Sequence, residues 1–381
     1  MRKYPWSMKF DDLRESSLCV KNTPLPGYTL TNFLYLLAQN KFKINAQYIP
    51  RMIYSLSLSS IMLPFSIKER IQFDRRTKQT TIARPPLFII GHWRSGTTYL
   101  HNVLSNDKNL GYLTTFQAYL PAVFLASEPL FKPLVSSSIP EKRPMDDVLM
   151  NAEYPQEDQY AIGAYSPYSY YHGWCFPQNM EFYNNYVCMD GVPKKTIDDW
   201  KGYYLYLLKK LTLHHQGKRL VLKNQDNTGK LHILLEMFPD AKFIFLYRNP
   251  YDLYFSMMKF MKITIPRFCV QKPPELEVVE QSMMNLYVRM TQKYLKERDE
   301  IPQGNLVEVR YEDFIAQPFQ ELKNIYKTLQ LQGLQNATPA FQTYLAAQKN
   351  IKTDKYTMNE DIQQKIERKW GFAIREFGYQ I

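Results

Sequence analysis

Cysteine and histidine are scarce in this chain of 381 residues, which contains 4 cysteines and 6 histidines. None of the cysteines, Cys19, Cys175, Cys188 and Cys269, stands in the C-x-x-C spacing of a zinc or redox site. A disulfide framework is also excluded, because such frameworks belong to short, cysteine-dense secreted chains. The sequence therefore predicts reduced thiols, as in a cytoplasmic protein, and no metal centre.

A long apolar run is missing as well. Residues 1–17 contain no apolar core of the kind that secretory signals carry. The most apolar early stretch, Met52–Phe65, is shorter than the ~20 residues that a membrane-spanning helix needs. Two interpretations of this stretch stay open: a helix buried in the core, or a helix at a membrane surface or at the mouth of a substrate site. We expect a cytoplasmic protein in which residues 49–66 are the segment able to contact a membrane.

Acidic residues are outnumbered by basic ones, and the formal net charge is +12. An excess of this size favours anionic partners, such as nucleic acid, an anionic membrane or a phosphorylated small molecule. The basic residues are scattered and form no run interleaved with aromatic residues, so nucleic acid is the weakest of these partners.

Short apolar runs alternate with helical patterns after residue 85, and this alternation predicts an α/β fold with a parallel sheet covered on both faces. The predicted strands are Leu87–Ile90, Arg219–Lys223, Lys242–Arg248 and Asn305–Tyr311. Residues 1–83 are predicted to be a helical N-terminal extension, 85–330 the core, 132–185 an irregular aromatic-rich insertion, and 331–381 a C-terminal segment, all within one domain. Parallel sheets bind ligands at the carboxyl ends of their strands, so the loops Gly91–Thr98, Lys223–Asn227 and Arg248–Ser256 are expected to converge on one site.

The loop after the first strand reads GHWRSGTT and resembles a phosphate-binding P-loop without its lysine. Thr97 stands where that lysine is expected, and Arg94 is the fixed cation of the loop. The strand Lys242–Arg248 ends in arginine and offers no carboxylate for Mg²⁺, which disfavours a metal-dependent kinase or NTPase. Arg248 and Ser256, on the next strand–turn–helix, make a second and separate candidate phosphate site.

Together, GHWRSGTT and YRNPYDLYFS resemble the two cofactor motifs of sulfotransferases that use 3′-phosphoadenosine 5′-phosphosulfate, and PQED (Pro155–Asp158) is similar to the bacterial branch of that superfamily. The resemblance covers roughly residues 85–314 and implies a co-substrate bound without metal. It implies the following contacts: Arg94, Ser95, Gly96, Thr97 and Thr98 with the 5′-phosphosulfate, Arg248 and Ser256 with the 3′-phosphate, Tyr311 with the adenine, and, from a looser C-terminal match, Arg368 with the 3′-phosphate.

Sulfuryl transfer needs cations at the leaving oxygen and a base for the acceptor hydroxyl. Arg94 and Lys223 suit the first role, Lys223 because it matches a family lysine. The base is harder to assign, because Asn227 stands near the position where related sequences often carry histidine. Glu157 is the first candidate, with Asp158 as its orienter or substitute, and the alternative is that both cap a helix. His172 is the alternative base, and His92 is expected to be a positioned donor.

The run Tyr160–Tyr186 is rich in aromatic residues, and it is predicted to be a packed clasp, the wall of an apolar acceptor pocket, or both. Such a wall favours a small hydrophobic hydroxyl compound, that is a sterol, phenol or lipid alcohol. A carbohydrate acceptor stays open, as do, from other classes, a P-loop nucleotide kinase and an inactive nucleotide-binding relative. The sequence does not indicate an oligomeric state.

Overall fold

The structure is a computed structural model that describes residues 10, 23–143, 148–348 and 358–380. Cys19 therefore lies outside the described residues, whereas Cys175, Cys188 and Cys269 are buried free thiols.

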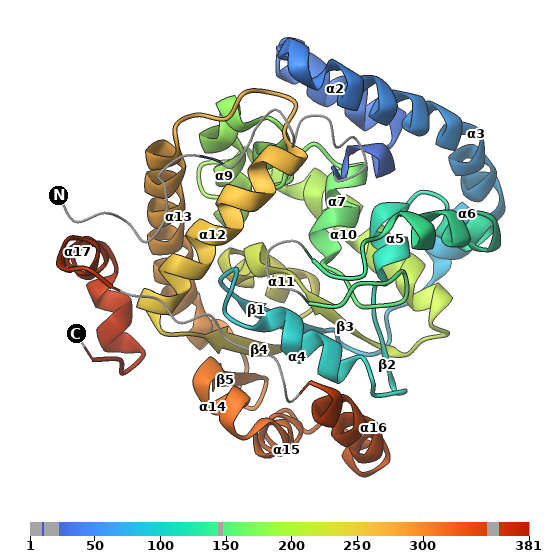
Figure 1. Cartoon of the computed structure of the whole chain (residues 1–381). Coiled ribbons are helices and arrows are strands. Elements are labelled where there is room, and N and C mark those ends of the chain that lie inside the picture. Colours follow the sequence, from blue (N-terminus) through green and yellow to red (C-terminus); the bar gives the residue numbers. More distant parts are fainter. Residues whose placement is uncertain (1–9, 11–22, 144–147, 349–357, 381) are drawn as a thin grey trace.

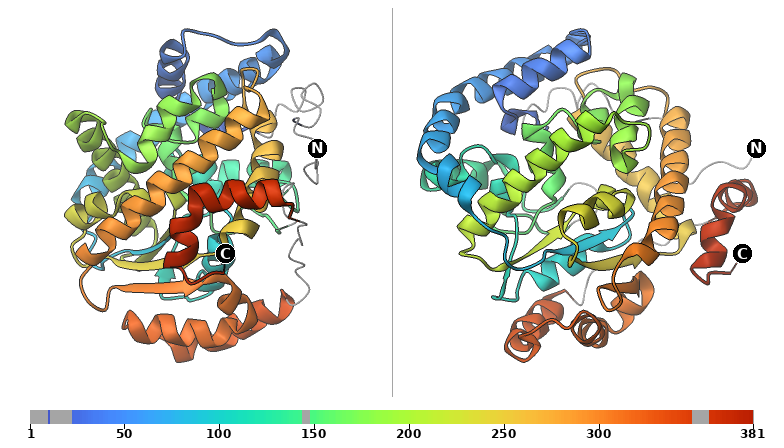
Figure 2. Two further views of the ribbon diagram at one scale, coloured as in Figure 1. Left: turned by 90° about the vertical axis from the view of Figure 1, so that its left-hand side faces the viewer. Right: turned by 180° about the vertical axis from the view of Figure 1, so that it is seen from behind.

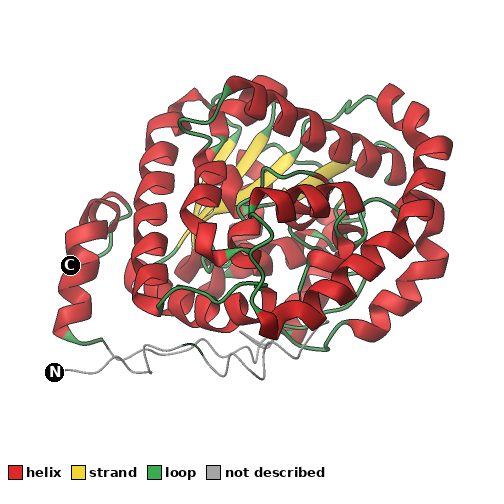
Figure 3. Ribbon diagram, turned by 90° about the horizontal axis from the view of Figure 1, so that it is seen from above, coloured by secondary structure: helices red, strands yellow, loops and turns green. Residues whose placement is uncertain are grey.

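Five parallel strands form a sheet at the centre of the molecule, surrounded by helices (Figure 1 and Figure 3). The strands are β1 (Leu87–Gly91), β2 (Leu110–Gly111), β3 (Arg219–Lys223), β4 (Lys242–Tyr247) and β5 (Leu306–Arg310), in the order β2-β3-β1-β4-β5. The parallel α/β fold predicted from the sequence is confirmed, with four strands at the predicted positions. Strand β2 has only 2 residues and is too short to carry a pattern.

Each face of the sheet has its own hydrophobic core, because successive strand residues point to opposite faces. On β1, Leu87 and Ile89 belong to one core, and Phe88 and Ile90 belong to the other. The first core is closed by α4 (Thr97–Leu104), α14 (Tyr311–Ala316), α15 (Pro318–Thr328) and α16 (Leu334–Ala347), below the sheet in Figure 1. The second, larger core is closed by α10 (Lys194–His214), α11 (Leu231–Met237), α12 (Pro250–Phe268) and α13 (Leu276–Glu297).

The segment between β2 and β3 contains the predicted aromatic insertion. Before α10, its helices are α5 (Thr115–Tyr119), α6 (Phe124–Ser138), α7 (Asp158–Tyr165), α8 (His172–Cys175) and α9 (Met180–Cys188). Tyr170, Tyr171, Trp174 and Tyr183 of this segment are buried in the larger core. The interpretation of the run as a clasp packed on the fold is confirmed, because these rings stabilise the cover over the sheet.

The remaining helices lie at the two ends of the chain. Near the N-terminus are α2 (Leu30–Gln39) and α3 (Ile49–Gln79), and near the C-terminus is α17 (Glu360–Glu376). Helix α17 packs against α12 and α13, at the edge of the molecule in Figure 1 and across its front in the left view of Figure 2. Short 3₁₀ turns are η1 (Leu25–Gly27), η2 (Ala46–Tyr48), η3 (Pro177–Asn179), η4 (Gln225–Gly229) and η5 (Arg298–Glu300).

Helix α3 is attached to the fold by polar side chains. Arg51 is buried and donates to the carbonyl oxygens of Pro266, at 3.1 Å, and Cys269, at 2.5 Å. Glu69 is buried in an ion pair with Lys210, and its Oε2 also accepts from the amide of Leu125 at 2.6 Å. Because buried charges are tolerated only with partners, these contacts fix which face of α3 points inward.

The face of α3 opposite these anchors carries apolar side chains. Ile53 is 56% exposed, Ile67 49% and Ile71 80%. The expectation of a buried core helix for Met52–Phe65 is therefore wrong: these residues belong to a 31-residue helix along the outer edge of the molecule (Figure 2, right view). Within the described residues, none of the helices combines the length and apolarity required to cross a bilayer.

Replacing Lys210 by Met is expected to destabilise the chain by about 3–5 kcal/mol, because Glu69 is left as a buried charge without its cation. In a Glu69→Gln background the same replacement is expected to cost much less, since no charge remains uncompensated. Urea unfolding of the four proteins measures this difference. Lys195→Met, which removes an exposed ion pair with Asp199, is the control and should leave the midpoint near wild type. Equal costs of Lys210→Met in both backgrounds would contradict the account.

Candidate active site

The loop between β1 and α4 has a backbone that only glycine accommodates at its critical positions. Gly96 has φ +94°, and a Cβ atom there would lie 2.3 Å from the ring of Tyr311. Thr228, in the loop after β3, holds Gly91 in place. Its Oγ1 accepts from the Gly91 amide at 2.7 Å and donates to the Gly91 carbonyl at 3.1 Å. The loop is thus fixed where α4 begins, with the amide groups of the first helical turn available to an anion.

The three predicted loops converge at the carboxyl ends of β1, β3 and β4. Lys223 is the register partner of Ile89 on β1. Gln225 Nε2 donates to Thr97 Oγ1 at 3.2 Å, which links the loop after β3 to α4. Arg248 Nη1 donates to the carbonyl oxygen of Arg94 at 3.0 Å, which links the loop after β4 to the β1–α4 loop. The prediction that these segments meet is confirmed by these contacts.

Lys223 and Glu157 form a buried ion pair at the centre of this site. The Lys223 Nζ lies 2.5 Å from Glu157 Oε1 and also donates to Thr98 Oγ1 at 3.3 Å. Gln225 Nε2 donates to the same carboxylate oxygen at 3.1 Å. Burial lowers the pKa of Lys223, and the Glu157 charge opposes that shift. The cation at the end of β3 and a carboxylate of the insertion are therefore in direct contact.

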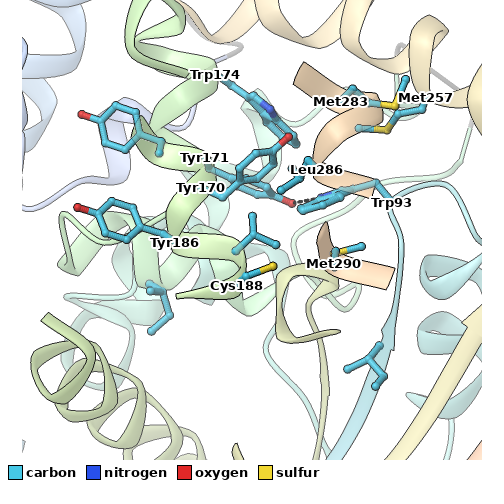
Figure 4. Close-up of a cluster of buried hydrophobic side chains, with 14 of the residues drawn as sticks. Trp93, Tyr170, Tyr171, Trp174, Tyr186, Cys188, Met257, Met283, Leu286 and Met290 are labelled. Atoms are coloured by element: carbon cyan, nitrogen blue, oxygen red, sulfur yellow. Dashed lines mark hydrogen bonds between the residues drawn. The ribbon is translucent and has the colours of Figure 1, made fainter. Parts of the chain in front are cut away.

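Aromatic side chains surround the other oxygen of Glu157. The Tyr171 hydroxyl donates to Oε2, and Trp93 Nε1 donates to the Tyr171 hydroxyl at 3.4 Å, the contact drawn in Figure 4. The Tyr171 ring stacks on Trp174 at 4.3 Å and meets Tyr160 edge-on at 4.9 Å. This oxygen of the carboxylate thus faces a largely apolar wall, whereas the other contacts Lys223 and Gln225 at the end of β3.

The residues of the second motif lie beside Arg94. Arg94 Nε donates to Ser256 Oγ at 3.0 Å, and the Arg248 guanidinium lies 4.6 Å from the centre of the Tyr311 ring. The two candidate phosphate sites were expected to be separate, with Arg94 in one and Ser256 in the other. In the structure Arg94 joins them, because its long side chain extends from the β1–α4 loop to α12.

A buried donor in this group fits an anionic ligand. The Arg248 Nε is buried and has no hydrogen-bond partner within the described residues. Buried guanidinium donors are rarely left unpaired, and a phosphate oxygen would satisfy this one. Two guanidinium groups, the Ser256 hydroxyl and the amides at the start of α4 thus fit a nucleotide with two phosphate groups.

Other predicted residues do not join the Lys223–Glu157 pair. The His172 ring is fully buried, with Nε2 2.8 Å from the Ser166 carbonyl and Nδ1 3.2 Å from the Tyr28 hydroxyl, and burial lowers its pKa to about 4. Burial also lowers the pKa of His92 to about 4. Asn227 donates to the Tyr204 hydroxyl at 3.1 Å. Arg368 is exposed on α17.

Sequence reasoning missed Gln225, Tyr171 and Thr228. Gln225 follows Lys223 by two residues at a strand end, and this position was the available signal. Tyr171 is one of many tyrosines in its run, so nothing in the sequence distinguishes it. Glu157 does stand at the N-cap of α7, but its side chain makes no capping bond there and instead contacts Lys223.

Comparison with known proteins decides the family. The family model described as the sulfotransferase family matches residues 85–335. The chain belongs to the sulfotransferase family. It is 29% identical, over 93% of its length and 90% of the relative, to the omega-hydroxy-beta-dihydromenaquinone-9 sulfotransferase Stf3 of Mycobacterium bovis and of Mycobacterium tuberculosis.

Solved bacterial sulfotransferases share the fold. The structure of STF9 from Mycobacterium avium aligns over 100% of this chain and 99% of its own, with a TM-score of 0.65 and 14% identity. That of STF1 from Mycobacterium tuberculosis aligns over 95% and 94%, with a TM-score of 0.59 and 18% identity. The sulfotransferase fold thus extends beyond the matched family segment into the N-terminal helices.

The buried carboxyl of Asp158 provides a test of the site's electrostatics. Burial raises its pKa from 3.8 to about 7, although it accepts from the Tyr204 hydroxyl. Between these values the folded chain holds a proton that the unfolded chain has lost, so stability falls as pH rises. Asp158→Asn is expected to remove this fall, which is at most about 1.4 kcal/mol per pH unit. Urea unfolding from pH about 4 to about 8 measures it.

The matched control is Asp198→Asn, which changes an exposed carboxyl on α10. Its free energy of unfolding should depend on pH as that of wild type does. An Asp158→Asn profile that also runs parallel to wild type would show that this carboxyl is ionised in the folded chain throughout the range.

Proposed function

We propose that this sulfotransferase moves the sulfuryl group of 3′-phosphoadenosine 5′-phosphosulfate to the hydroxyl of a small hydrophobic acceptor, without metal. We call the segment Gly91–Thr98 the donor loop. The observation that carries the proposal is the position of Lys223, between Thr98 of the donor loop and Glu157. A lysine there can neutralise the oxygen that leaves the sulfuryl group, and the carboxylate can take the proton of the attacking hydroxyl.

The donor contacts follow from the two motifs. The amides and hydroxyls of Ser95, Thr97 and Thr98 would hold the 5′ end, with Gly96 allowing the close approach of the loop. Arg248 and Ser256 would hold the 3′-phosphate, and Tyr311, under the Arg248 guanidinium, would lie beside the adenine. The bound donor supplies the activated sulfuryl group. Arg94 contacts Ser256 in the structure and would share its charge between the two ends.

Glu157 is the proposed base. Its ion-pair partner Lys223 is proposed to leave the carboxylate when the donor binds. When the Lys223 ammonium turns towards a bound donor, the carboxylate loses its ion-pair partner and can accept the proton of the attacking hydroxyl. Gln225 would then keep Oε1 in place, while Oε2 faces the aromatic wall from which an acceptor approaches. Arg94 and Lys223 are the cations proposed at the leaving oxygen. His172 is disfavoured, because both of its ring nitrogens already have partners.

The acceptor proposed is a lipid-like alcohol. The relative with 29% identity is named for a hydroxylated menaquinone, and the rings beside Glu157 suit an apolar molecule with one hydroxyl. This favours a lipid alcohol over a sterol or a phenol, and over the carbohydrate alternative. A cytoplasmic enzyme acting on such an alcohol needs contact with a membrane, which we propose for residues 49–66.

A thermal-shift series tests the donor. The product 3′-phosphoadenosine 5′-phosphate, without metal, is expected to stabilise the chain by about 2.7 kcal/mol at a hundredfold excess over its Kd. Arg248→Gln should lose most of this gain, whereas Arg76→Gln, an exposed arginine on α3, should keep it. Stabilisation by ATP with Mg²⁺ and not by the bisphosphate would favour the nucleotide kinase instead.

Kinetics of Glu157→Gln test the base. Glutamine keeps the shape of the side chain, and its oxygen can still accept from Lys223 and Gln225, but it cannot take a proton, so kcat is expected to fall about 10²–10⁴-fold with bisphosphate binding retained. Transfer of labelled sulfonate to a panel of lipid alcohols, sterols, phenols and sugars measures the rate and identifies the acceptor class. Glu153→Gln, an exposed carboxylate four residues earlier, is the control. Near-normal turnover by Glu157→Gln would remove the carboxylate from the reaction.

A further inference from the structure

Helix α3 buries polar side chains and leaves an apolar face exposed. Its buried residues are Arg51, Ser55, Ser59, Glu69 and Thr77. Its outward face carries Ile49, Ile53, Leu63, Ile67 and Ile71, all exposed and spaced so that they share one side of the helix. A surface helix normally turns its apolar stripe to the core. Helix α3 does so only in part, with Met52, Leu56, Met62 and Phe65 half-buried against the core, and it leaves a row of isoleucines uncovered in the structure.

The outward face of α3 cannot turn inward, because the opposite face carries charged side chains that are bound to fixed partners. Arg51 is held by two carbonyl oxygens near the end of α12, and Glu69 by Lys210 of α10. Rotating α3 to bury its isoleucines would expose or unpair these charges, each of which costs several kcal/mol when unpaired. The apolar face is thus a stable feature of the fold.

The neighbouring helix α6 extends this surface. Helix α6 packs beside α3, with the rings of Phe65 and Phe131 edge-to-face at 4.8 Å. Its Leu130 and Leu134 are 54% and 62% exposed. Figure 1 places α3 and α6 side by side at one side of the molecule, away from α17 and the C-terminus. We call the exposed apolar residues of α3 and α6 the α3–α6 face.

Basic side chains border the α3–α6 face and indicate what covers it. Lys68, Arg70, Arg75, Arg76 and Lys78 of α3 are all exposed. The acids of α3 are Glu69, buried against Lys210, and Asp74, paired with Lys78. An apolar stripe bordered by lysine and arginine is typical of helices that lie in the interface of an anionic bilayer, whereas a second copy of this chain would bring a like-charged border.

A small groove lies beside α3, at the border of this face. It is lined by Met62 and Leu63 of α3, by Tyr28, and by Leu120 and Val123 of the α5–α6 connection. Leu120 follows Tyr119, whose ring meets Tyr160 at 5.9 Å, and Tyr160 in turn meets Tyr171 at 4.9 Å. Tyr171 donates to Glu157. Packed rings thus lie between the lining of the groove and the proposed base.

We propose that the α3–α6 face docks on an anionic lipid bilayer, which would place the groove beside α3 at the bilayer surface. The docking surface extends to α6 the membrane contact proposed above for residues 49–66, and it stands on the uncovered isoleucines of α3 and on the basic border. The helix, about 46 Å long at 1.5 Å per residue, would lie parallel to the bilayer plane.

Sedimentation with vesicles of phosphatidylcholine, with or without phosphatidylglycerol, tests the docking. The full chain is expected to bind the vesicles that contain phosphatidylglycerol and to be released by salt. Ile53→Ser/Ile71→Ser should lower partitioning about tenfold or more. The matched control Phe182→Ser/Val278→Ser changes two exposed apolar residues on α9 and α13 and should bind as wild type. Lys68→Glu/Arg75→Glu should remove the preference for phosphatidylglycerol.

Three readouts separate this inference from the proposed function. Thermal stabilisation by 3′-phosphoadenosine 5′-phosphate should be equal in wild type and in all variants, which shows that they are folded with the donor site intact. Wild type that stays in the supernatant with both vesicles, or a dimer by light scattering that Ile53→Ser/Ile71→Ser converts to monomer, overturns the docking. Vesicle binding without sulfuryl transfer to an embedded alcohol contradicts the proposed function but supports the docking on the bilayer.

Discussion

The contact between Lys223 and Glu157 is the interaction on which the site depends. A buried lysine is costly unless a carboxylate compensates it, and here the carboxylate comes from the insertion while the lysine ends a central strand. Thr98 and Gln225 complete the arrangement from α4 and η4. The ion pair therefore holds the donor loop, the sheet and the insertion in one geometry, and a ligand that competes for the lysine would free the carboxylate.

The fold supplies this geometry through the order of its strands. Because β3 and β4 flank β1, their carboxyl ends place Lys223 and Arg248 on either side of the glycine loop. The two cores, one on each face, hold the strands in register, and the aromatic clasp of α7–α9 covers the strand ends. Tyr171 and Trp93 belong at once to this packing and to the surroundings of Glu157. Stability and chemistry thus share the same side chains.

Most of the sheet and of the candidate site could be predicted from the sequence, because they are encoded in short stretches of neighbouring residues. Four strands, the glycine loop and the two arginine motifs are short patterns, and parallel topology brings their ends together. The roles of Gln225 and Tyr171 could not be predicted, since they depend on contacts between distant segments. The joining of Arg94 and Ser256 depends on how far one side chain extends. The environment of α3 is predicted wrongly, because its apolar residues indicate a core helix. In the structure, buried Arg51 and Glu69 determine which face of the helix points inward.

A crystal structure of the chain with 3′-phosphoadenosine 5′-phosphate tests the central claim most directly. The account predicts the 5′-phosphate on the amides at the start of α4, with the Lys223 Nζ turned from Glu157 to within hydrogen-bond distance of that phosphate and the carboxylate facing the aromatic wall. A nucleotide bound elsewhere, or a 5′-phosphate beyond the reach of a Lys223 that remains on Glu157, would contradict it.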